Sequence, residues 1–179
     1  MEKENGTNLN NTIGVLVWAR NYPKEEVFLT MIDYVSKTLK KSIIFFIDDL
    51  CPKQVYARSD EEQGLYNVQY ESFFQSNNVP YYFSSELIKP DEVTLNSIKD
   101  LLNGISIKEY ASYLPQKKVK NNELEIKEII HTAFQEVLLR KVLLIVPTIL
   151  LGKFSQNLVM LHKKLTGESV ETIIIDRIT

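Results

Sequence analysis

Two short apolar runs near the N-terminus constrain the fold of this chain more than any other feature. They are residues 12–19 (TIGVLVWA) and 42–47 (SIIFFI), and their β-branched and aromatic content is typical of buried strands. Between them, apolar residues from 27 to 39 recur at helical spacing, and Pro23 followed by acidic residues favours a helix start. A strand, a helix and a strand in this order predict a parallel βαβ unit with a right-handed crossover.

Helix-like and strand-like segments continue to alternate along the rest of the chain. We expect helices at 63–75, 92–102, 105–114, 123–139 and 154–165, strands at 79–87 and 170–178, and polar connections at 52–62 and 116–122. The apolar run 143–151 fits either a strand or the end of the preceding helix, because Pro147 lies inside it. This alternation predicts an α/β protein with a mainly parallel sheet.

The composition sets the size and class of the protein. The chain has 179 residues, of which 44 % are hydrophobic and 25 % are charged, and this suits one domain with its own core. We expect residues 1–11 to be a disordered lead-in and residues 12–179 to form a single domain. A net charge of -2 gives no electrostatic footprint for nucleic acid. A single cysteine, with no membrane-length apolar run and no apolar signal core, favours a cytoplasmic protein without a membrane partner.

Polar residues follow three of the predicted strands. Parallel α/β sheets bind ligands beyond the carboxyl ends of their strands, and this rule selects residues 18–21, 48–51 and 84–86. Arg20 suits a phosphate or a carboxylate, and Asp48 or Asp49 suits a ribose hydroxyl or an ammonium group. The ligand-binding candidates here are Trp18, Arg20, Asn21, Asp48 and Asp49. The alternative is that the two aspartates only end a strand in a polar turn before Pro52.

A second candidate segment is residues 150–165, LLGKFSQNLVMLHKKL. Gly152 follows an apolar run, and Ser155 and Gln156 open a predicted helix whose first amides would be free to bind an anion. We therefore include Gly152, Ser155 and Gln156 among the ligand-binding candidates. The alternative is an ordinary strand-to-helix turn with a serine or asparagine cap.

Several common chemistries find no support in the sequence. The nucleophile elbow, the P-loop and the glycine-rich dinucleotide motif are absent. Cys51 has no histidine near it in sequence, so we expect a structural thiol rather than a nucleophile. His131 and His162 both fall on predicted helices, and with one cysteine they make no metal site that we would predict. No residue is assigned a catalytic role.

Taken in order, these segments resemble the nucleotide-binding fold of class I aminoacyl-tRNA synthetases, most of all the tyrosyl and tryptophanyl enzymes. FLTMIDYVSKTLKKSIIFFIDDL resembles a helix and second strand that end in Ala-Asp or Gly-Asp in that family. The family's Tyr-x-x-x-Gln-x-x-Asp pattern falls on His131, Gln135 and Leu138, and its Gly-Gly-x-Asp-Gln turn falls on Gly152, Ser155 and Gln156. Over residues 12–179 the resemblance implies a Rossmann-like (HUP-type) parallel sheet flanked by helices. It adds Gln135 to the binding candidates and ATP or AMP as candidate cofactors.

The departures from the family pattern concern its catalytic groups. YPKE, residues 22–25, stands where the family has His-x-Gly-His, whose histidines stabilise phosphate charge during adenylate formation. No Lys-Met-Ser-Lys-Ser sequence follows the last predicted strand. The two acids that would hold an amino-acid ammonium are replaced by Leu138 and Ser155. Standard aminoacyl-adenylate synthesis is therefore not expected.

Three hypotheses for function follow. The first is a stand-alone, degenerate class I synthetase-like domain that binds a nucleotide or an amino-acid-like small ligand without standard aminoacylation. The second is a protein-interaction or homo-oligomeric module on a nucleotide-binding fold, for which the aromatic stretches VPYYF and YESFF supply material. The third is a transferase that uses Asp48 and Asp49.

Overall fold

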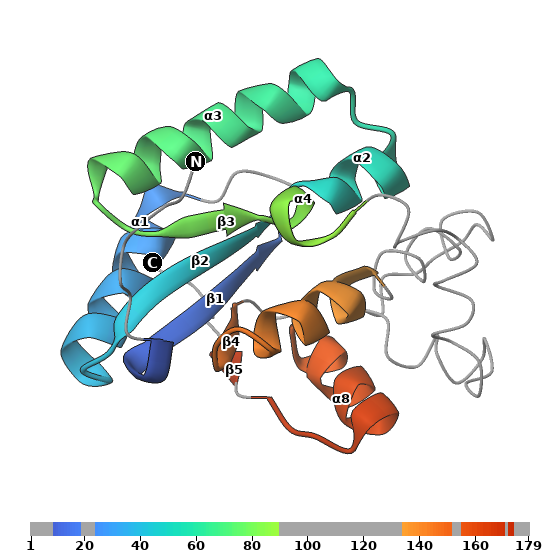
Figure 1. Ribbon diagram of the computed structural model, residues 1–179. Helices are drawn as coiled ribbons and strands as arrows, with labels where there is room; N and C mark the ends of the chain where they lie inside the picture. The colour runs from blue at the N-terminus through green and yellow to red at the C-terminus, as the bar shows by residue number, and fades with distance from the viewer. Residues whose placement is uncertain (1–8, 19–23, 90–133, 152–154, 171, 174–179) are drawn as a thin grey trace.

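The computed structural model describes residues 9–18, 24–89, 134–151, 155–170 and 172–173, and these form a five-stranded sheet in the order β3-β2-β1-β4-β5 (Figure 1). The strands are β1 (Thr12–Trp18), β2 (Ser42–Asp48), β3 (Tyr81–Phe83), β4 (Thr148–Leu151) and β5 (Thr172–Ile173). Every pairing in this sheet is parallel, and the predicted α/β class with a parallel sheet is therefore confirmed.

The predicted βαβ unit is present in the first fifty residues. The 3-10 turn η1 (Leu9–Asn11) leads into β1, and α1 (Glu25–Asp33) continues through the π-helical turn η2 (Tyr34–Thr38) before β2. β1 and β2 then pair over their whole length, from Thr12 beside Ser42 to Trp18 beside Asp48. The further helices are α2 (Leu50–Tyr56), α3 (Asp60–Ser76), α4 (Ser84–Leu87) and α8 (Ser155–Thr166), and residues 134–143 are also helical.

Helices cover both faces of the sheet. On one face, alternate residues of β1 and β2, such as Val15 and Phe45, pack with α1 and α3 in a core rich in aromatic rings. On the other face, Leu16 and Phe46 pack with the helix of residues 134–143 and with α8. Figure 1 accordingly shows α3 and α8 on opposite sides of the sheet. Because both faces are buried in apolar side chains, polar chemistry is left to the edges of the sheet and the strand ends.

The polar connection expected at residues 52–62 is wrong, because most of it is helical. Pro52 lies in the first turn of α2, where a residue without an N–H costs nothing since the first amides of a helix have no partner within it. Ala57, with φ of 52°, ends α2 in the left-handed region. Ser59 then caps α3 by accepting a hydrogen bond from the Glu62 amide at 3.1 Å, so α3 starts earlier than residue 63.

The strand expected at residues 79–87 is much shorter in the structure. β3 has three residues, and the chain turns at once into α4. The Glu86 carboxylate accepts a hydrogen bond from the Phe83 amide at 2.8 Å, which gives one amide at the start of this helical turn a partner. The run 143–151 combines both of its expected structures, since residue 143 is still helical and β4 begins at Thr148, directly after Pro147.

Some expectations fall on residues that the structure does not describe. These are the N-terminal eight residues of the expected lead-in, the helices expected at 92–102 and 105–114, the connection expected at 116–122, the part of the 123–139 helix before residue 134, and most of the last strand. Within the described ranges, no helix combines the length and the apolar character that a membrane span requires.

At Gly14, the residues around β1 leave no room for a Cβ atom. A Cβ atom at this position would lie 2.7 Å from Thr148 Oγ1, 2.8 Å from Val146 Cγ2 and 3.0 Å from Phe46 Cε2. Gly14→Ala should therefore destabilise the fold by about 1–3 kcal/mol through overpacking. The measurement is urea unfolding followed by circular dichroism.

Gly64 provides the matched control for this substitution. It lies inside α3, and a Cβ atom there would meet no heavy atom within 4 Å. Gly64→Ala should stabilise the protein by about 0.5–1 kcal/mol, because alanine loses less backbone entropy in a helix. A neutral or stabilising effect of Gly14→Ala would contradict the packing described for β1.

Candidate functional site

The carboxyl ends of the strands meet at one edge of the sheet. The pairing places Trp18 beside Asp48 and Ile47 beside Phe83, so β1, β2 and β3 end next to one another. From β1 the strand order runs to β2 and β3 on one side and to β4 and β5 on the other. The order therefore reverses between β1 and β4, which is the position where open α/β sheets form a ligand crevice.

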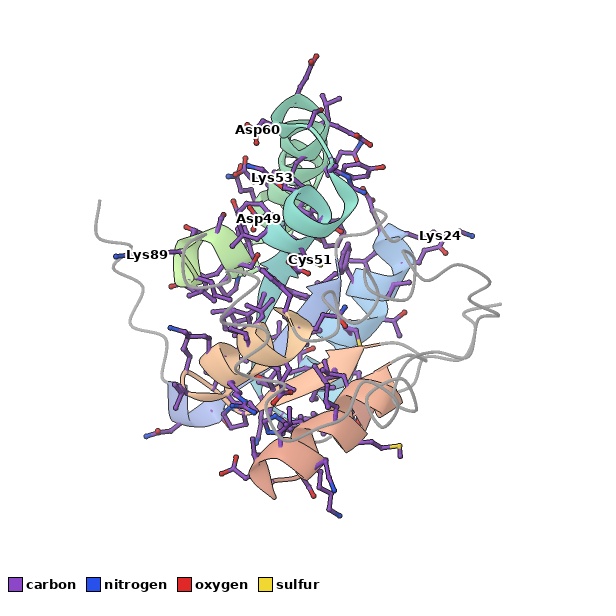
Figure 2. All side chains as sticks on the ribbon, turned by 90° about the vertical axis from the view of Figure 1, so that its right-hand side faces the viewer. Lys24, Asp49, Cys51, Lys53, Asp60 and Lys89 are labelled. Carbon is purple, nitrogen blue, oxygen red and sulfur yellow. The ribbon has the colours of Figure 1, made fainter. Side chains whose placement is uncertain are left out.

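Asp49 connects the end of β2 to the first turn of α4. Its Oδ1 accepts hydrogen bonds from the Ser84 hydroxyl at 2.8 Å and from the Ser85 amide at 2.9 Å. Its Oδ2 accepts one from the Ser85 hydroxyl at 2.7 Å. Figure 2 shows Asp49 beside the short helix α4, with Cys51 a little further along α2. The Asp49 side chain is 5 % exposed, so these bonds replace most of its contact with water.

The Ser84 hydroxyl is the centre of this network. Its oxygen accepts hydrogen bonds from the amides of Asp49 and Leu50, both at 3.1 Å. Its single hydrogen faces two carboxylates, Asp49 Oδ1 at 2.8 Å and Asp48 Oδ1 at 3.3 Å. The hydroxyl thus satisfies two amides at the start of α2 and one carboxylate at a time.

Asp48 is a buried acid with an unusual protonation equilibrium. The side chain is 1 % exposed, and its Oδ1 accepts a hydrogen bond from the Cys51 amide at 3.0 Å. Burial raises the pKa of Asp48 from its ordinary value of 3.8 to about 7, and the carboxylate of Asp49 adds to the rise. The amides of Cys51 and Leu50 and the Ser84 hydroxyl act in the opposite direction. Asp48 therefore exchanges its proton near neutral pH.

These contacts limit what the two aspartates can offer a ligand. A carboxylate has about four lone-pair directions, and three of those of Asp49 already accept hydrogen bonds from Ser84 and Ser85. Asp48 is enclosed between β2, α2 and α4. Both acids thus join the end of β2 to the first turns of α2 and α4. This is the role expected if the two aspartates only end a strand in a polar turn. A ligand hydroxyl that reaches Asp49 would use the lone pair that remains on Oδ2.

The other predicted residues are placed differently. Trp18 is the last residue of β1, and Ser155 and Gln156 are the first two residues of α8. Gln135 is half-buried on the helix of residues 134–143, beside the buried Glu136. The structure thus brings Trp18 next to Asp48. Arg20, Asn21 and Gly152 lie outside the described residues.

Sequence reasoning missed the role of Ser84 and Ser85. Both belong to the segment selected as the end of the third strand, but neither was chosen as a candidate. Their contacts with Asp49 span 35 and 36 positions of sequence, so only the sheet order could have indicated them. The available signal was their position directly after a strand next to β2.

A second buried polar cluster joins the helix of residues 134–143 to α8. Glu136 Oε1 is 2.8 Å from His162 Nδ1 and also accepts a hydrogen bond from Arg140 Nε at 2.8 Å. Glu136 and His162 are fully buried, and Glu136 Oε2 and His162 Nε2 have no hydrogen-bond partner. His162 lies on a helix, as its pattern predicted, and the structure shows that it is buried. Among the described residues, no group of three or more His, Cys, Asp or Glu side chains could hold a metal ion.

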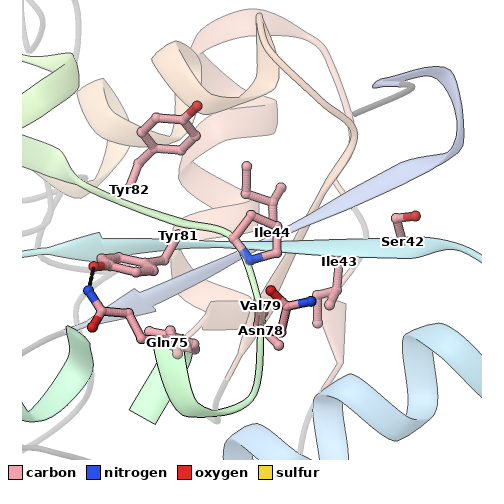
Figure 3. A pocket seen from close by; sticks show the side chains of 10 residues that line it. Ser42, Ile43, Ile44, Gln75, Asn78, Val79, Tyr81 and Tyr82 are labelled. Carbon is pink, nitrogen blue, oxygen red and sulfur yellow. Dashed lines mark hydrogen bonds between the residues drawn. The ribbon is translucent and has the colours of Figure 1, made fainter. Parts of the chain in front are cut away.

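An open groove of about 740 Å³ lies at the opposite edge of the sheet (Figure 3). Ser42, the first residue of β2, lines it together with Asn78, Val79 and Tyr81 from the turn that leads into β3. Tyr81 accepts a long hydrogen bond from Gln75 at 3.5 Å on its rim. None of the predicted ligand-binding residues that the structure describes lines this groove.

Comparison with known proteins finds similar solved structures, but no matching family profile or curated sequence. No protein-family profile matches the sequence, and no curated protein matches it. The fold is similar to that of tyrosyl- and tryptophanyl-tRNA synthetases. A tyrosyl-tRNA synthetase from Archaeoglobus fulgidus, complexed with L-tyrosine, superposes with a TM-score of 0.62 at 12 % identity over 91 % of this chain and 54 % of its own.

Two tryptophanyl-tRNA synthetases give the same result. The enzyme from Plasmodium falciparum has a TM-score of 0.60 at 9 % identity over 91 % of this chain and 48 % of its own. The enzyme from Encephalitozoon cuniculi, bound to tryptophan, has a TM-score of 0.59 at 11 % identity over 92 % and 52 %. The chain thus has a class I synthetase-like, Rossmann-like fold and spans about half the length of these synthetases. At this level of identity the likeness establishes the fold alone.

Loss of the Ser84 hydroxyl should lower the free energy of unfolding. Ser84→Ala would leave the Asp49 and Leu50 amides without an acceptor and Asp49 Oδ1 without one of its donors, all in a buried environment. We expect a loss of about 2–4 kcal/mol in the free energy of unfolding, measured by urea titration. Ser72→Ala, on the exposed face of α3, should change stability by less than about 0.5 kcal/mol. Equal effects of the two variants would disprove the central role of Ser84.

Proposed function

We propose that this chain binds a nucleoside phosphate, of which AMP and ATP are the representatives to test, at the carboxyl edge of the sheet, without synthesising an aminoacyl adenylate. The observation that carries the proposal is the reversal of strand order between β1 and β4. In open α/β sheets the crevice formed by such a reversal is the usual place for a nucleotide. The likeness to synthetases of this fold agrees with that choice of ligand class.

The start of α8 supports the phosphate part of this proposal. α8 begins at Ser155, four residues after β4 ends at Leu151, so it starts close to the carboxyl end of the strand where the order reverses. Its first turn contains no acidic residue, and its last turn contains Lys163 and Lys164. The free amides and positive dipole end of a helix of this length favour a phosphate group.

The leucine at position 138 favours a nucleotide over an amino acid as the ligand. Similar solved structures hold L-tyrosine or tryptophan, but the position at which the family resemblance implies an acid for the ligand ammonium is Leu138 here. Leu138 is fully buried in the apolar core between the sheet and its helices. A leucine in that place offers no acceptor to an ammonium group, and YPKE replaces the histidines that would assist adenylate formation.

Isothermal titration calorimetry with AMP and ATP tests the proposal. We expect saturable binding of at least one of them, and no binding of tyrosine or tryptophan at the same concentrations. Gln156→Glu adds a negative charge at the second residue of α8 and should weaken phosphate binding about tenfold. Adenosine, which lacks the phosphate, should lose less affinity than AMP in this variant.

Met160→Glu is the matched control for that variant. It makes the same change of charge on the same helix, at a side chain that is 58 % exposed and more than one turn from the helix start. AMP affinity should stay close to that of the unmodified chain. The proposal fails if neither AMP nor ATP binds, or if both glutamate variants weaken AMP binding equally.

A further inference from the structure

We propose that Asp48, Asp49 and Ser84 form a pH-sensitive latch, which holds the start of α2 against α4 while Asp48 is protonated and loosens when Asp48 ionises. The latch is defined by these three residues. It is a property of the chain without ligand and does not depend on the proposed nucleotide binding.

The number of available hydrogens creates the switch. The Ser84 oxygen accepts hydrogen bonds from the Asp49 and Leu50 amides, which occupy its two lone pairs, and one hydrogen remains for donation. Asp49 Oδ1 at 2.8 Å and Asp48 Oδ1 at 3.3 Å both compete for that hydrogen. While Asp48 carries its proton, Asp49 takes the Ser84 hydrogen without competition. When Asp48 releases its proton to solvent, two adjacent carboxylates share one donor.

Charges on the helices that the latch joins are paired elsewhere. Among the described side chains of α2 and α4, the charged or titratable ones are Cys51 and Lys53 of α2 and Glu86 of α4. Lys53 forms an ion pair with Asp60, and Glu86 accepts a hydrogen bond from the Phe83 amide. No ion pair to either latch aspartate occurs within the described ranges. On the face covered by the helix of residues 134–143, the buried Glu136 is bound by Arg140 and His162.

The raised pKa of Asp48 gives the direction of the effect. The folded chain holds this proton up to a pH of about 7, whereas an unfolded chain releases it near 3.8. Between these values the folded state binds more protons than the unfolded state, so stability falls as pH rises through this window. The contribution of Asp48 to the free energy of unfolding is constant below about pH 4 and again above about pH 7. The latch is therefore tightest on the acidic side of neutrality.

The experiment is an NMR titration of the full chain from pH 5 to 8.5. The side-chain carboxyl carbon of Asp48 should titrate with a midpoint near 7, and the Asp49, Leu50 and Ser85 amide signals should shift with the same midpoint. The protection of these three amides against hydrogen exchange, corrected for the intrinsic rate, should fall about tenfold across the transition. Asn78, at the other end of the sheet, should not report this midpoint.

Two variants separate the latch from a general effect of pH. Asp48→Asn keeps the shape and the acceptor for the Cys51 amide but cannot ionise, so the pH dependence of the three amides should disappear. Asp33→Asn removes the same charge from an exposed residue of α1 and should leave the pH dependence of the three amides intact. An Asp48 carboxyl carbon that does not titrate between pH 5 and 8.5, or amides of Asp49, Leu50 and Ser85 that do not change over this range, would overturn the proposal.

Discussion

The described structure depends on the pairing of β1 with a parallel strand on each side. β1 is matched to β2 along seven residue pairs and to β4 along three, and both of its faces are buried. This central position forces helices onto both faces of the sheet and directs all strand ends toward the same edge. It also sets the point where the strand order reverses. Gly14, which has no room for a side chain between Thr148 and Phe46, shows how closely the strand and its neighbours pack.

The polar groups at the carboxyl edge mostly satisfy one another. Asp48 and Asp49 looked like ligand-facing acids because two charges directly follow a buried strand. In the structure they accept hydrogen bonds from amides of α2 and α4 and from the serine hydroxyls of α4. Burial also raises the pKa of Asp48 above that of a surface aspartate. The edge therefore combines an internal polar network between β2 and β3 with the reversal of strand order between β1 and β4. The proposed phosphate site belongs to the second part.

The α/β class and the parallel sheet could be predicted from the sequence because the spacing of apolar residues is a local pattern. The βαβ unit, the parallel sheet and α8 followed from the spacing of apolar residues, and Pro23 with the acidic residues after it favoured the start of the first helix. The helix α2 was missed because a proline near its start has the same appearance in sequence as a proline in a loop. The roles of Ser84 and of the pair Glu136 and His162 could not be predicted from local patterns, because their partners lie 26 to 36 residues away.

Mapping AMP onto the protein by NMR tests the central proposal most directly, namely that the carboxyl edge of the sheet binds a nucleoside phosphate. The amides of Trp18 and of Ser155, at the two sides of the strand reversal, should show the largest shifts on saturation with AMP. The amides of Asn78 and Tyr81, in the groove at the other edge, should remain unchanged. Shifts confined to that groove, or no shifts at millimolar AMP, would contradict the account.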